Sequence, residues 1–110
     1  DGEMAIGTTW ESALIAAHHK LDNLVVIVDC NGLQAMGKTD EILRVPRYFQ
    51  TQSINGHDYK QIEKAVEEGG WIYANTVKGK GVSFMENNND WHYRAVDDES
   101  YELATKELGQ

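Results

Sequence analysis

The sequence predicts an α/β fold in which parallel strands are joined by helical crossovers. Amphipathic helical segments alternate with short strand segments in the order helix, strand, helix, strand, helix. Residues 24–28 form a continuously apolar and mostly β-branched run, which is typical of a strand covered on both faces. The run ends at Asp29, where polar residues begin, and ligands bind outside the carboxyl ends of strands in open α/β sheets. Candidate ligand-binding residues are therefore expected at this strand end.

The first helix is expected over about residues 8–21. Thr8 and Glu11 have the spacing of a capping box, and apolar side chains then recur at helical intervals. The apolar positions are Trp10, Ala13, Leu14, Ala17 and Leu21. His18 and His19 are adjacent and point in different directions on a helix, so we expect them to be solvent-facing or packed rather than metal ligands.

The second half of the chain is expected to contain two more helices and one more strand. Residues 40–50 could form a short helix interrupted by Pro46, which has no amide proton. Asp58 opens a helix that a glycine pair stops, and a strand over residues 71–77 follows. The final helix starts near Asp97. The side chains expected to be buried are Ile62, Ala65 and Val66 of the middle helix and Tyr101, Ala104 and Leu108 of the last.

The 110 residues are enough for one domain with a single modest core. Two or three strands are few for a parallel sheet, which has both faces covered and usually has more neighbouring strands. We therefore expect further strands to come from the same polypeptide or from a partner chain.

Composition excludes several classes of partner. Ten Lys and Arg against eighteen Asp and Glu give a net charge of −8, which repels the phosphate backbone, so nucleic acid is not an expected partner. The longest apolar run, residues 24–28, is far shorter than the roughly 20 residues of a membrane helix, so no membrane association is expected. Cys30 is the single cysteine, which excludes an intrachain disulfide, and no secretory signal pattern is seen. A cytoplasmic location is the expectation.

Two polar groups could bind a ligand at strand ends, namely Asp1-Gly2 and residues 29–32. The Asp1 carboxylate, the Asn31 amide oxygen and a main-chain carbonyl are hard oxygen donors that suit Mg²⁺ or Ca²⁺ holding a diphosphate. Gly2 would let the backbone approach a phosphate closely. From composition alone, a frayed terminus and an ordinary Asn-Gly turn are the simpler interpretation of the same residues.

A wider pattern extends over nearly the whole chain. It opens with Asp1-Gly2-Glu3 and reaches Asn31 about thirty residues later. Its other segments are Trp10-Glu11, residues 16–24, residues 29–34, Asn55-Gly56-His57-Asp58, residues 78–87 and Asp90-Trp91-His92. In this order they closely resemble transketolases, whose thiamine-diphosphate motif opens with Gly-Asp-Gly and closes with Asn. The resemblance implies that residues 1–110 are the second half of a parallel-sheet thiamine-diphosphate-binding domain of transketolase type, which would be incomplete by itself.

The resemblance implies a role for each matching residue. In the family, the positions of Asp1, Asn31 and the carbonyl of Leu33 bind the divalent metal, which bridges to the cofactor diphosphate. The position of Gly2 is a glycine whose amide contacts the diphosphate, and Glu3 belongs to the same motif. We therefore expect Gly2, Glu3 and Asn31 to bind the cofactor, with Mg²⁺ or Ca²⁺ as the metal.

His92 matches a histidine that lies near cofactor and substrate in the family, so we expect it to bind the cofactor and to be catalytic. Without the resemblance, a loop histidine packed beside Trp91 would be the simpler interpretation. Two positions depart from the family pattern, because transketolases usually have Glu in place of Ile6 and Gly in place of Tyr93. The sequence between residues 43 and 55 is also shorter than in the family, and Cys30 is expected to be an apolar filler rather than a nucleophile.

Two functions are compatible with these residues. The resemblance implies part of an enzyme that transfers a two-carbon ketol unit between sugar phosphates with thiamine diphosphate and a divalent metal. Nothing here matches the family's earlier segment or the second domain whose Glu activates the cofactor, so the isolated chain is expected to be inactive and to need the same polypeptide, a companion subunit or a homodimer. The alternative is a non-catalytic α/β remnant or interaction module. Ile6 and Tyr93 favour the remnant, whereas Asp1, Asn31 and His92 favour the enzyme.

Overall fold

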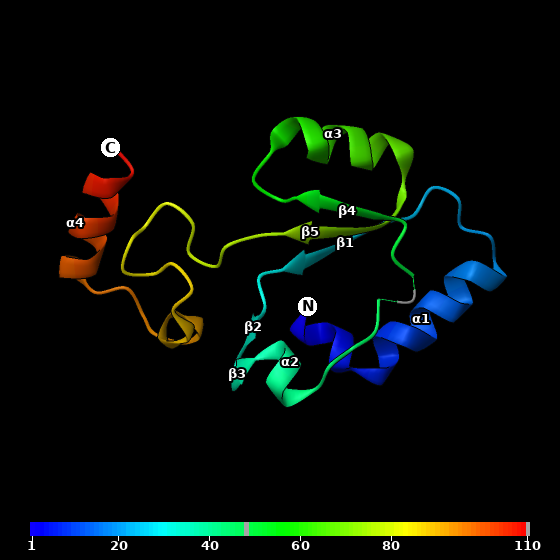
Figure 1. The fold of residues 1–110 in the computed structure, drawn as a ribbon, viewed down its shortest axis with the longest axis horizontal. Coiled ribbons are helices and arrows are strands. Elements are labelled where there is room, and N and C mark those ends of the chain that lie inside the picture. The colour runs from blue at the N-terminus through cyan, green and yellow to red at the C-terminus, as the bar shows by residue number, and fades with distance from the viewer. Residues whose placement is uncertain (48, 110) are drawn as a thin grey trace.

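The computed structural model describes residues 1–47 and 49–109. Within them, three parallel strands form a sheet in the order β1, β5, β4, with α3 beside it in the view of Figure 1. The strands are β1 (Val25–Cys30), β4 (Gln52–Asn55) and β5 (Gly70–Asn75). The predicted α/β class with a parallel sheet is confirmed. The two expected strands lie within two residues of their predicted ends, but sequence analysis did not identify β4.

The pairing of β1 with β5 places their carboxyl ends at the same level. Val25 is opposite Gly70 and Cys30 is opposite Asn75, so the register runs without interruption. Beyond the last pair, the Thr76 amide still donates to the Cys30 carbonyl, with 3.2 Å between nitrogen and oxygen. Because β4 pairs with β5 in the same direction, all three strands end at one edge of the sheet.

One face of the sheet carries the main apolar cluster. Met4, Val28 and Tyr73 are buried there, with Met4 coming from η1 (Gly2–Ala5). An aromatic stack covers the same face, in which the Phe49 ring lies 5.6 Å from that of Trp10 and 5.3 Å from that of Trp71. Phe49 belongs to the irregular segment before β4, so aromatic packing covers the sheet where no helix is formed.

The other face packs on α3 (Tyr59–Glu68), which begins and ends as predicted. The Asp58 carboxylate accepts hydrogen bonds from the amides of Lys60 and Gln61, and the helix ends at Gly69, whose φ is +75°. Of the three side chains expected to be buried, Ala65 is buried and Ile62 is half-buried. Val66 was expected to be buried and is exposed.

The expectation that β1 is covered on both faces is wrong at Ile27, which is 55% exposed. The helix α3 contacts β4 and β5 and does not extend over β1. In the part of the chain that the structure describes, β1 also has no strand on its outer edge. The helix on this face is too narrow to cover Ile27 as well as β4 and β5.

The first helix, α1 (Gly7–His18), is shorter than predicted and starts differently. No side chain caps it, so the expected capping role of Thr8 is wrong, and the Thr9 hydroxyl instead donates to the Glu3 carbonyl over 3.0 Å. Ala13 is buried, but the rest of the apolar face lacks a covering layer in the described residues. Leu14, Ala17 and Leu21 are exposed, Trp10 is half-buried, and His18 and His19 are solvent-facing, in agreement with one of the two expectations for them.

Residues 40–50 do not form the expected helix. The helix α2 covers only Thr39–Ile42, and Leu43 is extended with a φ of −153°. Pro46 disfavours helical backbone at the residue before it as well as removing a donor, which explains the early end. Position 48 of the expected helix lies outside the described residues. A short hairpin of β2 (Leu33–Gln34) and β3 (Gly37–Lys38) precedes α2 and was not predicted.

The last helix, α4 (Asp98–Glu107), starts as predicted but lies away from the sheet (Figure 1). Its contacts are with the loop after β5, where the Ser83 hydroxyl donates to the Glu107 carboxylate over 2.7 Å. The predicted burial of Tyr101 and Leu108 is therefore wrong, since both are exposed, and Ala104 is only half-buried. Among the described helices, none is long and apolar enough to cross a membrane.

Replacing Phe49 with alanine should remove the central ring of the aromatic stack. Because the side chain is half-buried, we expect a loss of about 2 kcal/mol in the free energy of unfolding, less than the 3–5 kcal/mol typical of a fully buried ring. Urea unfolding measures the change. Tyr59→Ala, which removes an exposed ring, is the control and should change stability by less than about 0.5 kcal/mol. Equal effects of the two substitutions would contradict the role of the stack.

Replacing Asp58 with alanine should lower the melting temperature in a pH-dependent way. The Gln61 amide, the Gln61 side chain and the Lys60 amide donate hydrogen bonds that hold the pKa of Asp58 below its ordinary value of 3.8. A depressed pKa in the folded state stabilises the fold above the unfolded-state value, and this contribution is lost as the pH falls through the folded-state value.

The difference in melting temperature between wild type and Asp58→Ala should therefore shrink between about pH 7 and about pH 3. Asp58→Asn caps a helix without a titrating charge and should show no such dependence relative to Asp58→Ala. A difference between wild type and Asp58→Ala that stays constant over this pH range would contradict the charge-assisted cap.

Candidate functional site

An open pocket of about 530 Å³ lies at the carboxyl edge of the sheet. Residues from the chain start, the end of β1, the hairpin and the loop after β5 meet around it. All predicted site residues line this one pocket, namely Asp1, Gly2, Glu3, Asn31, Leu33 and His92. The structure thus brings together residues that are up to 91 positions apart in the sequence.

The start of the chain and the end of β1 are tied together by hydrogen bonds. The Gly32 amide donates to Oδ2 of Asp1 over 2.7 Å, and the Leu33 amide donates to Oδ1 of Asn31 over 2.9 Å. The Asn31 side-chain amide donates in turn to the Asp29 carboxylate over 3.4 Å. These bonds hold the two predicted metal-binding side chains at the same edge of the pocket before any ligand enters.

The donor chemistry fits a divalent hard cation. A carboxylate, an amide oxygen and the Leu33 main-chain carbonyl are the oxygen ligands that Mg²⁺ and Ca²⁺ prefer, and each oxygen can accept more than one interaction. Within the described residues, no three His, Cys, Asp or Glu side chains cluster closely enough to hold a metal ion by themselves. A cation at this edge would therefore use the amide and carbonyl oxygens, and would leave positions for the oxygens of a diphosphate.

Gly2 is required by the packing of the protein itself. A Cβ atom at this position would lie 2.9 Å from Cβ of Gln34 in β2, which is closer than real Cβ contacts occur. The glycine therefore lets the start of the chain lie against the hairpin. This is a second reason for a glycine here, in addition to the close approach to phosphate that sequence analysis predicts.

His92 reaches the pocket from η2 (Asn89–His92) and packs on the ring that follows it. Its imidazole lies 4.8 Å from the Tyr93 ring in an edge-on arrangement. Trp91 packs instead on Phe84, at 5.3 Å between ring centroids. The imidazole is exposed and lines the pocket.

The rim of the pocket is partly apolar, and it includes Met36, which the sequence does not predict there. Met36, in the turn of the hairpin, is 80% exposed and lines the pocket together with Ile6 and Tyr93. The Asn89 side chain holds η2 against the same hairpin by donating to the Ala35 carbonyl over 3.4 Å. No sequence signal marks Met36 or Asn89, because their place depends on the unpredicted hairpin.

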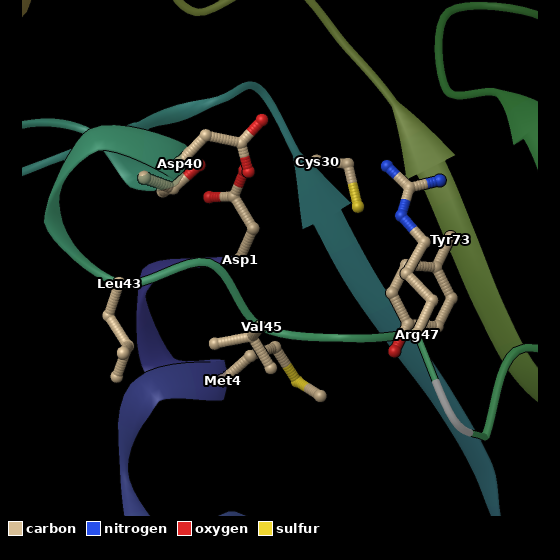
Figure 2. A pocket seen from close by; sticks show the side chains of 9 residues that line it. Asp1, Met4, Cys30, Asp40, Leu43, Val45, Arg47 and Tyr73 are labelled. Carbon is tan, nitrogen blue, oxygen red and sulfur yellow. The ribbon is translucent and has the colours of Figure 1, made fainter.

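Asp1 also lines a smaller pocket of about 70 Å³ (Figure 2). Burial raises the pKa of the Cys30 thiol, which disfavours the thiolate and agrees with an apolar filler rather than a nucleophile. The Arg47 guanidinium lies 5.0 Å above the centre of the Tyr73 ring. Burial also raises the pKa of the Tyr73 hydroxyl, which has no hydrogen-bond partner among the described residues.

Comparison with known proteins identifies the family to which this site belongs. The whole chain, residues 1–110, matches the family described as "Transketolase, thiamine diphosphate binding domain". The chain belongs to the transketolase family. Its fold also matches the crystal structure of transketolase from Campylobacter jejuni with a TM-score of 0.86 and 29% identity, covering 99% of this chain and 19% of that one.

Two curated members of the transketolase family are more similar in sequence. An apulose-4-phosphate transketolase subunit of Actinobacillus succinogenes is 35% identical, covering 98% of this chain and 44% of the relative. The 6-deoxy-6-sulfo-D-fructose transketolase subunit of a Clostridium species is 36% identical, covering 98% of this chain and 45% of the relative. The chain therefore spans less than half the length of these curated relatives.

Gly56, which follows β4, packs closely against the end of β5 because it has no side chain. A Cβ atom there would lie 2.4 Å from Cγ2 of Thr76, the residue that follows β5. Gly56→Ala should therefore cost about 1–3 kcal/mol of stability by overpacking. Gly7→Ala is the matched control, because a Cβ at Gly7 meets nothing within 4 Å and should stabilise by about 0.4–1 kcal/mol. Thermal unfolding measures both, and a neutral Gly56→Ala would contradict the close packing.

Proposed function

We propose that this chain provides the metal- and diphosphate-binding half of a transketolase-type site. Asp1, Asn31 and the carbonyl of Leu33 would hold a divalent metal, and Gly2 and Glu3 would lie along the diphosphate of thiamine diphosphate. The observation that carries the proposal is the convergence of these residues and His92 around one pocket. Family membership supports the choice of cofactor.

The residues of this chain have distinct tasks under the proposal. Asp1, Asn31 and the Leu33 carbonyl would hold the metal, whose positive charge would offset that of a diphosphate and help to orient it. Bound thiamine diphosphate would supply a carbon nucleophile for transfer of a two-carbon ketol unit between sugar phosphates. His92 faces the same pocket from the opposite loop, where its imidazole can exchange a proton or a hydrogen bond with a substrate hydroxyl.

The proposed enzyme would be completed by other segments, from the same polypeptide, a companion subunit or a homodimer. Both of the curated relatives described above are named as transketolase subunits, which supports a companion chain for this protein. The exposed apolar side chains of α1, such as Leu14 and Ile15, leave surface that an assembly could bury. The sugar-phosphate substrate would then be bound between the pocket of this chain and its companion.

Calorimetric titration of thiamine diphosphate into the assembled protein with Mg²⁺ tests the proposal. We expect saturable heat that requires the metal and that disappears in Asn31→Ala, because this substitution removes a metal-binding oxygen. Asn23→Ala is the matched control, since Asn23 is an exposed turn residue away from the pocket, and it should bind like wild type.

The titration also decides between the two functions. Absence of heat from wild-type protein that circular dichroism shows to be folded would contradict the proposed cofactor site. The non-catalytic α/β remnant or interaction module, which Ile6 and Tyr93 favour, would then be the better account of the chain. Heat that persists in Asn31→Ala would contradict the assignment of Asn31 as a ligand.

A further inference from the structure

Asp29 connects the end of β1 with the end of β5. The Thr76 hydroxyl donates to Oδ1 of Asp29 although the two residues are 47 positions apart. Oδ2 of the same carboxylate accepts a hydrogen bond from Nδ2 of Asn31 over 3.4 Å. Asp29 lines the candidate pocket and belongs to the polar group at residues 29–32, but the family pattern assigns it no role of its own.

Both hydrogen-bond partners of the Asn31 side chain favour the same orientation of its amide group. Oδ1 accepts from the Leu33 amide, and Nδ2 donates to Asp29. If the amide group turned over, two donors would face each other at Leu33 and two acceptors would face each other at Asp29. The Asp29 carboxylate accepts only, so it permits one orientation of the neighbouring amide.

This orientation matters because a metal ion binds the oxygen of an asparagine and not its NH₂ group. The Asp29 carboxylate could rotate by itself, since it is exposed at the strand end. The hydroxyl of Thr76, the residue that follows the adjacent strand β5, holds one of its oxygens and leaves the other for Asn31. The hydrogen bonds that Thr76 and Asn31 donate to Asp29 thus fix the metal-binding oxygen relative to the paired ends of β1 and β5.

We propose that Asp29 is a positioning residue for Asn31, with Thr76 holding the Asp29 carboxylate in place. This inference rests on the proposed function only where it concerns the metal. The Asp29 carboxylate does not bind the ion; it presents Oδ1 of Asn31 to it. Partners of this kind, beyond the ligands themselves, typically contribute about 10–100-fold to metal affinity.

Three substitutions separate positioning from general stability. Asp29→Asn keeps the shape of the side chain but replaces one acceptor oxygen with a donor, so the neighbour at position 29 no longer disfavours the turned-over Asn31 amide and only the Leu33 amide still does. Thr76→Val keeps the shape and removes the hydroxyl that holds Asp29. Thr76→Ser keeps the hydroxyl and is the conservative variant that should restore the effect.

The first measurement uses the assembled protein without metal or cofactor. Hydrogen exchange of the Asn31 side-chain amide, followed by NMR, should be slow in wild type and Thr76→Ser. We expect it to be several-fold faster in Asp29→Asn and Thr76→Val, because the amide has lost its fixed acceptor. Unchanged exchange in Asp29→Asn would overturn the inference.

The second measurement is Mn²⁺ affinity at saturating thiamine diphosphate, obtained from the EPR signal of free Mn²⁺. We expect affinity to fall about 10–100-fold in Asp29→Asn, to fall less in Thr76→Val and to remain close to wild type in Thr76→Ser. A lower melting temperature with unchanged Mn²⁺ affinity would overturn the inference. Asp29 would then connect the ends of the two strands without affecting Asn31 as a metal ligand.

The two measurements distinguish failure of the proposed function from failure of the positioning role. Wild-type protein that binds no Mn²⁺ would contradict the proposed function, and amide exchange would then decide by itself whether Asp29 orients Asn31. Normal Mn²⁺ binding in wild type together with wild-type affinity and exchange in Asp29→Asn would leave the proposed function standing and overturn the positioning role.

Discussion

The parallel pairing of β1 with β5 is the constraint on which the other features of this fold depend. The two strands are paired without interruption from Val25 and Gly70 to Cys30 and Asn75, and their ends coincide. This places Asp29 beside Thr76, and it places the loop that carries Asn31 beside the start of the chain. A shift of the register by one residue would turn every side chain of one strand to the opposite face of the sheet and would separate these groups.

The two faces of the sheet are stabilised differently. The α3 face is held by regular helix packing around Ala65, whose burial is almost complete. The opposite face depends on aromatic contacts of Phe49 with Trp10 and Trp71, because the segment before β4 remains irregular. Stacked aromatic rings bury a large area with few residues, so a short segment can replace a helix in covering the sheet.

The pocket combines a rigid edge with an exposed rim. Asp1, Asn31 and their hydrogen-bonded neighbours are fixed by the strand ends, and preorganised ligands of this kind lose little freedom when they bind. The rim is formed by Met36 and Tyr93, which are mostly exposed. Ile6 and Tyr93, two of the differences from the usual transketolase pattern, line this pocket, and so do the residues expected to hold the metal.

The features that depend on local chemistry could be predicted from the sequence, whereas those that depend on packing could not. The cap at Asp58, the stop at Gly69 and the apolar strand run were recognisable because neighbouring residues specify them. The family pattern also named six residues that the structure brings to one pocket, because it records their order along the chain. Of the helix predicted over residues 40–50, only the start forms, as part of α2, because Pro46 and the packing of Phe49 outweigh the helical signal in the rest. The exposure of Tyr101 follows from the position of α4 beside a loop rather than beside the sheet. Periodicity shows that a helix or strand has an apolar face, but what covers that face is set by strand order and register, which are properties of the whole chain.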